Sequence, residues 1–272
     1  MTLMSDHAST HAAAPRRFGR ADLQVHTAFG DGMEDARTIF ERVEVLGELD
    51  VIAITDHDDI RGALEARAVH ARAPYHFDLV TGIEVTTQHG HLLALWVEAP
   101  VRSFRPLEET IAAIHEQGGL AVVPHPFSLL TRSVGRRTLE RVLAIADTAT
   151  HPDGIEVANP TSAGWDTGIR AVEANRARWR LAETGGSDAH FMEAVGAAYT
   201  LFPGRTADEV RQAILDRTTA GRRGAGVPLR QIGAARIALQ QIRGLSVTPK
   251  KVLGPPLGRF AERVGERVRG RR

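Results

Sequence analysis

Short apolar runs alternate with amphipathic stretches along most of the chain. The stretches include residues 34–47 and 107–117, where apolar residues such as Ile39, Val43 and Ile111 recur at helical spacing. This alternation predicts parallel strands joined by crossover helices, and the number of strands favours an α/β barrel over an open sheet. The eight strand-like runs are residues 21–26, 50–55, 79–85, 91–97, 120–125, 154–159, 181–188 and 197–202.

Composition narrows the class of protein. The 272 residues are 43% hydrophobic, which is enough for one large core or two modest ones. Because there is no cysteine, disulfides, thiolate zinc sites and a cysteine nucleophile are all excluded. No run approaches the roughly 20 apolar residues of a transmembrane segment, and residues 1–17 lack the apolar block of a secretory signal. We therefore expect a disordered leader over residues 1–17 and a cytoplasmic protein.

The net charge of +1 hides two parts of opposite sign. Residues 221–272 contain 13 basic and 2 acidic residues, whereas residues 1–220 contain 21 basic and 31 acidic residues. The body is therefore acidic and the tail strongly basic, which gives the two parts different electrostatic roles.

Polar side chains that can bind metals gather where the predicted strands end. In barrels of this type the chemistry lies at those ends, so these residues form a predicted ring of ligands. Candidates from so many separate strand ends are hard to explain as helix caps, although "TDHDD" alone could cap the helix that begins near Ile60. His70, His76, His115 and His151 are interpreted as structural. The ring comprises His26, Thr55 to Asp58, Glu84, His125, Glu156 to Asn159 and Ser187 to His190, with His91 at the start of its run.

The first strand carries polar residues on one face. Asp22, Gln24 and His26 alternate along "ADLQVH", so their side chains leave the strand on the same side, and Asp31 follows between two glycines. Several polar groups on one face are unusual at the start of a core. We expect Asp22 to orient a ligand histidine from outside the metal shell.

Five motifs in order resemble a known family. "DLQVHTAFGDG", "ITDHD", "GIEVT…HLLAL", "VVPHP" and "GGSDAH" are together similar to the PHP (polymerase and histidinol phosphatase) family. The resemblance implies a distorted (β/α)7 barrel over residues 18–222, with a basic helical C-terminal extension over residues 223–272. It also implies a metal-dependent phosphoric ester hydrolase.

The resemblance assigns ligands for up to three metals. It places the first metal on His26, Glu84 and Asp188. The second takes Glu84 as a bridge with His91 and His125, and the third takes Asp31, His57 and His190. His89 competes with His91, but "HLLAL" matches the family better at His91.

The sequence departs from the family at Gln24, where the first motif normally has histidine. The glutamine carbonyl oxygen is a poorer ligand for zinc than imidazole but suits harder cations. Gln24 is therefore a ligand in a site for manganese, magnesium or iron, a residue beside a weak or empty site, or a hydrogen-bond partner of a metal-bound water. The predicted cofactors are two or three divalent ions, with Zn, Mn, Fe and Mg as candidates.

The expected reaction is hydrolysis of a phosphate ester by a metal-bound hydroxide, with Asp188, His125 and Glu84 as the catalytic residues. The expected substrate is a small phosphorylated metabolite, a nucleotide or a short oligonucleotide trimmed from its end. Arg132, Arg136 and Asn159 are candidates for binding it, although solvated-loop or turn roles also fit them. The alternative function is a catalytically weakened, metal-stabilised binding or regulatory module, which the change at Gln24 favours.

The basic tail predicts a short amphipathic helix over residues 258–272. Phe260, Val264 and Val268 recur every four residues beside a strip of arginines. It could contact nucleic acid or an anionic surface, or it could dock on the acidic body together with a helix over residues 229–242.

Overall fold

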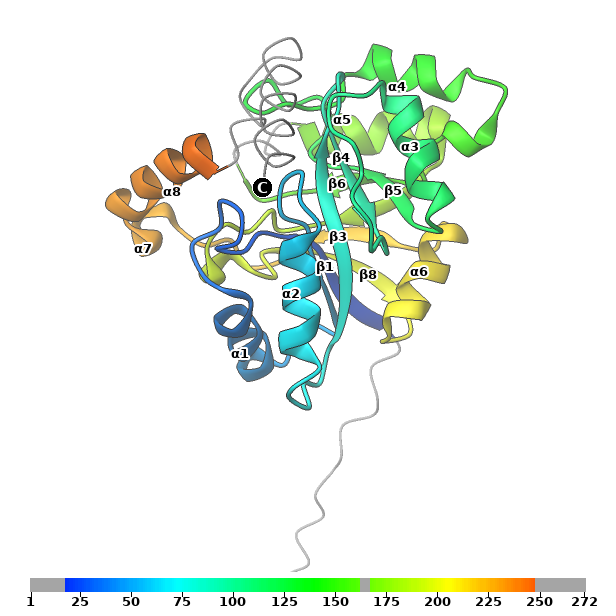
Figure 1. Cartoon of the computed structure of the whole chain (residues 1–272). Coiled ribbons are helices and arrows are strands. Elements are labelled where there is room, and N and C mark those ends of the chain that lie inside the picture. The colour runs from blue at the N-terminus through cyan, green and yellow to red at the C-terminus, as the bar shows by residue number, and fades with distance from the viewer. Residues whose placement is uncertain (1–17, 162–166, 248–272) are drawn as a thin grey trace, which may run out of the picture.

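The computed structural model of the protein describes residues 18–161 and 167–247 (Figure 1). The expected leader and the tail helix over residues 258–272 lie outside these residues. Within them the eight predicted strands are all present, and a ninth follows. The strands are β1 (Phe18–Val25), β2 (Val51–Ile54), β3 (Asp78–Thr86), β4 (His91–Leu95), β5 (Leu120–Val123), β6 (Gly154–Ala158), β7 (Ala182–Gly185), β8 (Ala198–Pro203) and β9 (Ala220–Arg223).

Helices connect most of the strands, as the periodicity predicts. Asp35 caps the first helix by accepting a hydrogen bond from the Thr38 amide, and Gly47 ends it in a left-handed conformation (φ 59°) that suits glycine. The α-helices are α1 (Ala36–Leu46), α2 (Arg61–His70), α3 (Leu107–Glu116), α4 (Arg136–Leu143), α5 (Thr167–Ala174), α6 (Ala207–Leu215), α7 (Leu229–Ile232) and α8 (Ala234–Val247), with short turns at Thr148–Thr150, Asn175–Trp179 and Met192–Ala194.

The strands form one strongly curved sheet in the order β7-β6-β5-β4-β3-β2-β1-β8-β9. This nearly closed sheet, with helices around it, is a mixed α/β barrel of the distorted type that the family resemblance implies (Figure 1). β1, β2 and β3 run parallel, as do β5, β6 and β7. The expectation of parallel strands was wrong for β4 and β8, which pair antiparallel with their neighbours, and the additional strand β9 also pairs antiparallel with β8.

The direction of β4 decides where His91 lies. β3 and β4 form a hairpin in which Thr86 pairs with His91, so β4 begins at the edge where β3 ends. A residue at the start of an antiparallel strand therefore joins residues at the ends of parallel strands. A bridge between His57 and Glu84 brings the end of β2 to the same place.

Two apolar clusters hold the barrel together. One contains Phe40 of α1 and Phe77, which precedes β3. The other contains Leu23 of β1 and Phe202 of β8. All four side chains are buried. Burying aromatic side chains of this size contributes much of the free energy of folding.

The C-terminal part of the described chain forms α7 and α8, at one side of the barrel (Figure 1). Between residues 18 and 247, apart from the short gap, no helix combines the length and the apolar character needed to cross a bilayer.

Candidate metal centre

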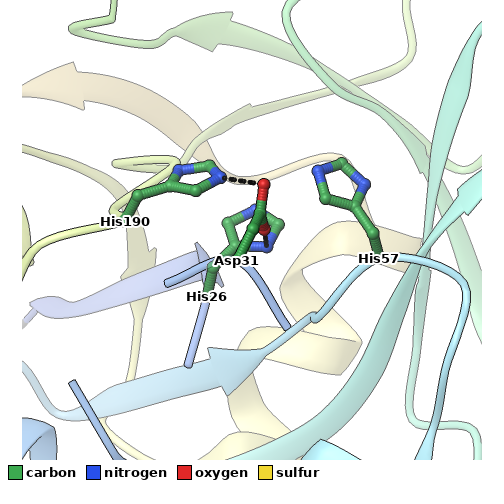
Figure 2. Close-up of side chains that lie close together, drawn as sticks. All are labelled: His26, Asp31, His57 and His190. Carbon is green, nitrogen blue, oxygen red and sulfur yellow. Dashed lines mark ion pairs between the residues drawn. The ribbon is translucent and has the colours of Figure 1, made fainter. Parts of the chain in front are cut away.

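Three histidines and a carboxylate meet at one end of the barrel (Figure 2). The His190 Nε2 lies 3.4 Å from Asp31 Oδ2, and the His26 Nδ1 lies 3.9 Å from Asp31 Oδ1. The His26 ring stacks on those of His190 and His57, with centroid distances of 4.2 and 4.8 Å. All four come from predicted strand ends or from the loop after β1, and they meet because the carboxyl ends of barrel strands lie at the same end of the barrel.

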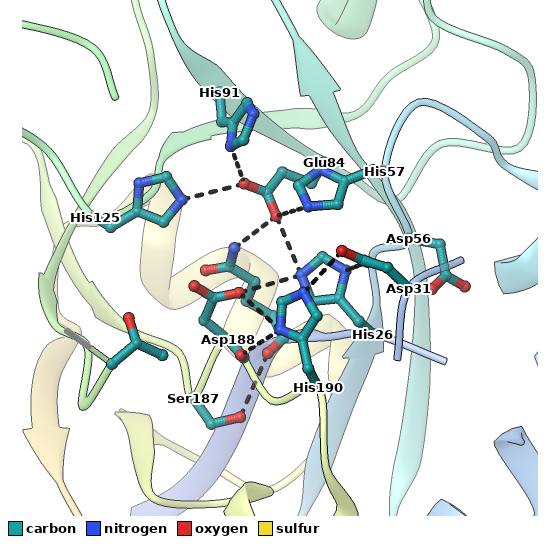
Figure 3. A network of polar contacts seen from close by, with 12 residues as sticks. His26, Asp31, Asp56, His57, Glu84, His91, His125, Ser187, Asp188 and His190 are labelled. Atoms are coloured by element: carbon teal, nitrogen blue, oxygen red, sulfur yellow. Dashed lines mark hydrogen bonds and ion pairs between the residues drawn. The ribbon is translucent and has the colours of Figure 1, made fainter. Parts of the chain in front are cut away.

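Glu84 is the centre of a second group of contacts (Figure 3). Both of its carboxylate oxygens face histidines that come from different strands. Oε1 lies 2.7 Å from His91 Nδ1 and 3.1 Å from His125 Nε2, while Oε2 lies 3.1 Å from His26 Nε2 and 3.8 Å from His57 Nε2. Asp188 completes this side, because its Oδ1 lies 3.2 Å from His26 Nε2.

Three overlapping groups of ligand atoms in the described chain could hold metal ions, and they resemble the three sets that the family resemblance implies. The first implied set appears unchanged. His57, which was assigned to the third set alone, lies in two of the groups. His125, which was assigned to the second set, lies in none of the three groups but contacts Glu84. The groups are His26, Glu84 and Asp188; His57, Glu84 and His91; and His26, Asp31, His57 and His190.

Gln24 lies inside the centre and is fully buried. Its Nε2 donates a hydrogen bond of 2.8 Å to Glu84 Oε2. The opposite amide orientation would face two oxygens toward each other, so the contact with Glu84 determines which end is nitrogen. Gln24 Oε1 is buried and has no hydrogen-bond partner among the described residues. The amide can therefore hold Glu84 with one end and offer a ligand oxygen with the other.

Several groups orient the ligands from outside. The Ser133 hydroxyl lies 2.8 Å from His125 Nδ1, which leaves Nε2 facing Glu84, and the Asp188 carbonyl lies 3.0 Å from His190 Nδ1. Asp22 was expected to orient a ligand histidine, but among the described residues it contacts backbone groups instead. Its carboxylate accepts the backbone N–H groups of Ser187 and Gly196, and it thereby fixes the loop that carries Asp188. Such contacts fix the direction of a metal ligand.

The ligands hold opposite charges. Burial disfavours protonated His125, but the neighbouring Glu84 carboxylate outweighs burial and raises the pKa of His125 to about 9. Burial likewise disfavours ionised Glu84, yet the His57 and His91 rings keep the pKa of Glu84 well below its usual value. Positive charge on the histidines thus balances the carboxylates, and a divalent cation would replace that positive charge on binding.

Two of these residues have an unusual backbone. His125 and Asp188 have φ values of 28° and 51°, in the left-handed region that residues with a Cβ seldom adopt. Both follow a strand end and point their side chains into the centre (Figure 3). Strained conformations of this kind concentrate at functional sites.

The residues fit divalent cations. His91 Nε2 and Gln24 Oε1 are buried without a hydrogen-bond or ion-pair partner in the part of the chain that the structure describes, whereas His26 Nε2, His91 Nδ1 and His190 Nε2 face carboxylate oxygens. Buried polar atoms normally have partners, because leaving one unpaired costs about 1–3 kcal/mol. Imidazole nitrogens and carboxylate oxygens at this density are the donors that Zn²⁺, Mn²⁺ and Fe²⁺ bind.

The predicted substrate residues already contact other parts of the chain. Arg132 donates to the Thr87 carbonyl at 3.4 Å, and Arg136 forms an exposed ion pair with Glu140. The Asn159 amide donates to Glu156 at 2.9 Å, while its oxygen accepts from the Thr161 amide and hydroxyl.

Glu156 was predicted as one of the ring of potential metal ligands, and its contacts in the structure give it a supporting position. Its Oε2 accepts the backbone N–H of His125 at 2.7 Å, and burial raises the pKa of Glu156 to about 8. It therefore supports the strained His125 backbone. The signal that could have found this role is its position in "IEVAN", two residues before the end of a buried strand.

The four histidines interpreted as structural contact residues that do not belong to the centre. His70 contacts the Phe77 carbonyl, His76 contacts Glu44, His115 contacts Asp153 and His151 contacts the Ile145 carbonyl.

Comparisons with known proteins agree with this geometry. A family model described as PHP-associated matches residues 170–219. The fold resembles that of a two-domain Bacteroides vulgatus protein containing a predicted PHP-like metal-dependent phosphoesterase, with a TM-score of 0.56 and 20% identity over 76% of this chain. The chain belongs to the PHP family. It spans 65% of the length of that two-domain protein.

Two further similarities place this PHP chain among other proteins. It is 33% identical over 151 residues to an uncharacterized protein from Methanocaldococcus jannaschii, covering 52% of this chain and 81% of the relative. Its fold also resembles an amidohydrolase from Chromobacterium violaceum with bound sulfate and no metal. The TM-score is 0.53 and the identity 20%, over 75% of this chain and 98% of the other. At this level of identity the solved structures establish a shared fold.

Proposed function

We propose that this PHP protein hydrolyses a phosphate ester of a small metabolite, a nucleotide or a short oligonucleotide, with two or three divalent ions. The observation that supports this proposal is the position of Glu84, whose two carboxylate oxygens face different histidines. A carboxylate in that position can bridge two cations. Paired divalent cations are the arrangement that many phosphatases and nucleases use for displacement at phosphorus.

Under this proposal the ions bind through the residues that meet at the centre. When bound, they supply a nucleophile by lowering the pKa of a water molecule, and they neutralise phosphate charge. Activity depends most on Glu84, His125 and Asp188, since these residues hold the centre from three different strands. The full set of proposed ligands is Gln24, His26, Asp31, His57, Glu84, His91, His125, Asp188 and His190.

The proposed substrate contacts are Arg132, Arg136 and Asn159. Arg136 lines a cavity of about 400 Å³ together with Phe127, Arg170, Glu173 and Arg178, in which three arginines outnumber one carboxylate and favour an anionic part of a substrate. The sulfate in the Chromobacterium violaceum protein has the tetrahedral shape of phosphate, which supports an anion of this shape in the fold. Arg132 and Asn159 remain candidates, and each would have to exchange a contact within the chain for one with substrate.

The test combines metal content with turnover. Protein purified without chelator is analysed by plasma mass spectrometry and assayed on p-nitrophenyl phosphate and bis-p-nitrophenyl phosphate with added Mn²⁺ or Zn²⁺. We expect bound ions and turnover in the wild type, and loss of turnover in Asp188→Asn and His125→Ala with an unchanged circular dichroism spectrum. His151→Ala is the matched control, because His151 contacts the Ile145 carbonyl and no residue of the centre in the described structure.

One observation favours a second function. Gln24 occupies a position where the family motif has histidine, as expected of a weakened centre in a binding or regulatory module. Bound metal without turnover of either ester, in wild type and variants alike, would support that module. Turnover that survives in Asp188→Asn would contradict the catalytic proposal.

A further inference from the structure

Two loops carry Asp31 and His190 to the centre. They follow β1 and β7 and are far apart in the sequence, but they contact each other directly. The Met33 amide donates to the His190 carbonyl at 2.9 Å, and the Met192 amide donates to Glu34 Oε2 at 3.0 Å. The spacing between Asp31 and His190 therefore depends on how these loops are held together.

Arg236 of α8 joins the same two loops from outside. Its guanidinium donates to Glu34 Oε1 at 2.6 Å and to Glu193 Oε1 at 2.5 Å. It also lies 5.3 Å from the centre of the Phe191 ring. One planar fork thus bridges a carboxylate from each loop.

Two more side chains of α8 contact the loop that holds Asp31. Arg243 donates to the carbonyls of Ala28 and Gly30, the second at 3.1 Å. Gln240 is only 4% exposed and its Nε2 lies 3.4 Å from the Asp31 carbonyl. These contacts leave the Asp31 side chain directed toward the histidines (Figure 2).

The three residues lie on one face of the helix, since they are spaced by four and three positions. The opposite side carries Leu239, Ile242 and Leu245, which are 54–64% exposed. A surface helix normally buries its apolar side and exposes its polar side. In α8 the polar side faces the protein, so its attachment depends on directed polar contacts with the two loops.

We propose that α8 is a positioning element for the cluster of His26, Asp31, His57 and His190. Arg236, Gln240 and Arg243 set the distance between Asp31 and His190 and so determine how tightly this cluster binds a divalent ion. The inference rests on the metal binding in the proposed function. It assigns a role to α8, which lies beyond the residues that match the PHP-associated family model.

The experiment measures metal affinity in the full chain. Metal-free wild type, Arg236→Ala and Arg243→Ala are titrated with Mn²⁺ by calorimetry, and thermal unfolding of each metal-free protein is recorded. Loss of contacts that orient metal ligands weakens binding about 10–100-fold. We expect that loss in one class of sites only, because the contacts of Arg236 and Arg243 are with the loops of this cluster. Arg236→Lys should restore affinity in part, since an ammonium lacks the planar fork.

Arg176→Ala is the matched control. Arg176 also forms a two-bond ion pair with a glutamate, Glu183, but it contacts neither loop in the described structure. This variant should keep the wild-type Mn²⁺ affinity. If Arg236→Ala does not fold, Glu193→Gln removes the same ion pair from the other side.

Unchanged Mn²⁺ affinity in Arg236→Ala and Arg243→Ala, with only a lower unfolding temperature, would overturn the positioning role. An equal loss in all classes of sites would also overturn it. If the wild type binds Mn²⁺ and the variants bind it with the same affinity, only the inference about α8 is contradicted. Wild-type protein that binds no Mn²⁺ contradicts the proposed function as well.

Discussion

Gly62 is a helix residue for which alanine should be harmful. It is the second residue of α2, and a Cβ added there would overlap Asp56 Oδ2 and lie 3.2 Å from both the Asp56 carboxyl carbon and Phe29 Cβ. Asp56 is buried, and it accepts hydrogen bonds of 2.7 Å from both the amide and the hydroxyl of Thr27. Thr27 follows His26 and starts the loop that carries Asp31. The substitution Gly62→Ala therefore acts on the support of the metal centre.

The size of the effect follows from these two bonds. A hydrogen bond to a charged group contributes about 1.5–3 kcal/mol, so losing both costs about 3–6 kcal/mol. Alanine is better than glycine in a helix by about 1 kcal/mol, which offsets part of the loss. We therefore expect Gly62→Ala to lower the free energy of unfolding by about 2–5 kcal/mol.

The assay is urea unfolding at pH 8, where Asp56 is ionised because burial raises its pKa only to about 6. Gly226→Ala in the loop after β9 is the control, since no described atom lies within 4 Å of the added Cβ. It should change stability by about 0.5 kcal/mol or less. In a Thr27→Val background, Gly62→Ala should cost less than in the wild type, because one of the bonds is already absent. A Gly62→Ala protein as stable as the wild type would refute this reasoning.

Three further predictions concern single side chains. Gln24→His should raise the affinity for Zn²⁺ relative to Mn²⁺, because imidazole replaces a neutral oxygen. Competitive calorimetry measures this ratio of affinities, and an unchanged ratio would contradict the prediction. Ser133→Ala should weaken metal binding about 10–100-fold by freeing the His125 ring, measured by the same titration. The hydrogen bond with Asp153 raises the pKa of His115, so its stabilising effect is complete below about pH 6.5 and is lost as the pH rises through the raised pKa. His115→Gln should therefore destabilise the protein more at pH 6 than at pH 9 in urea unfolding, and an equal loss at both would contradict the assignment.

The strands and most ligands could be predicted because both depend on local pattern. Strand ends in a barrel meet at one edge, so His26, His57 and His125 could be placed together before any coordinates. His91 fitted the same edge only because β4 turns back on β3, and the apolar run that contains it carries no information on direction. The PHP motifs supplied that position instead.

Strand direction and the ninth strand could not be predicted for a physical reason. β9 reads "AGRR", which has no apolar alternation, and its place depends on pairing with β8 at the edge of the sheet. Buried runs such as β4 are apolar on both faces whether they run parallel or antiparallel. Pairing between distant segments decides both features.

The contacts that support the centre are also long-range. Arg236 and Glu34 are 202 residues apart, and Ser187 and Asp22 are 165 apart. Docking of the 229–242 segment on the acidic body was one of the alternatives that the charge division left open, and Arg236 of this segment contacts two glutamates. The charge division did not predict that the polar face of α8 would turn inward, because that depends on carbonyl groups of the Asp31 loop rather than on charge.

Gln24 shows how a change in one ligand position can leave the rest of the centre intact. A smaller apolar residue there would remove the amide donor to Glu84 Oε2 and leave the space of the Gln24 side chain unfilled. The glutamine amide instead donates to Glu84 at 2.8 Å and is buried at the same depth as its neighbours. The position of Glu84 between the histidines is therefore retained, and the change falls on the character of one donor atom. For this reason we expect the substitution to alter which metal is preferred rather than whether the cluster forms, and the paired Zn²⁺ and Mn²⁺ titrations of Gln24→His separate these two effects.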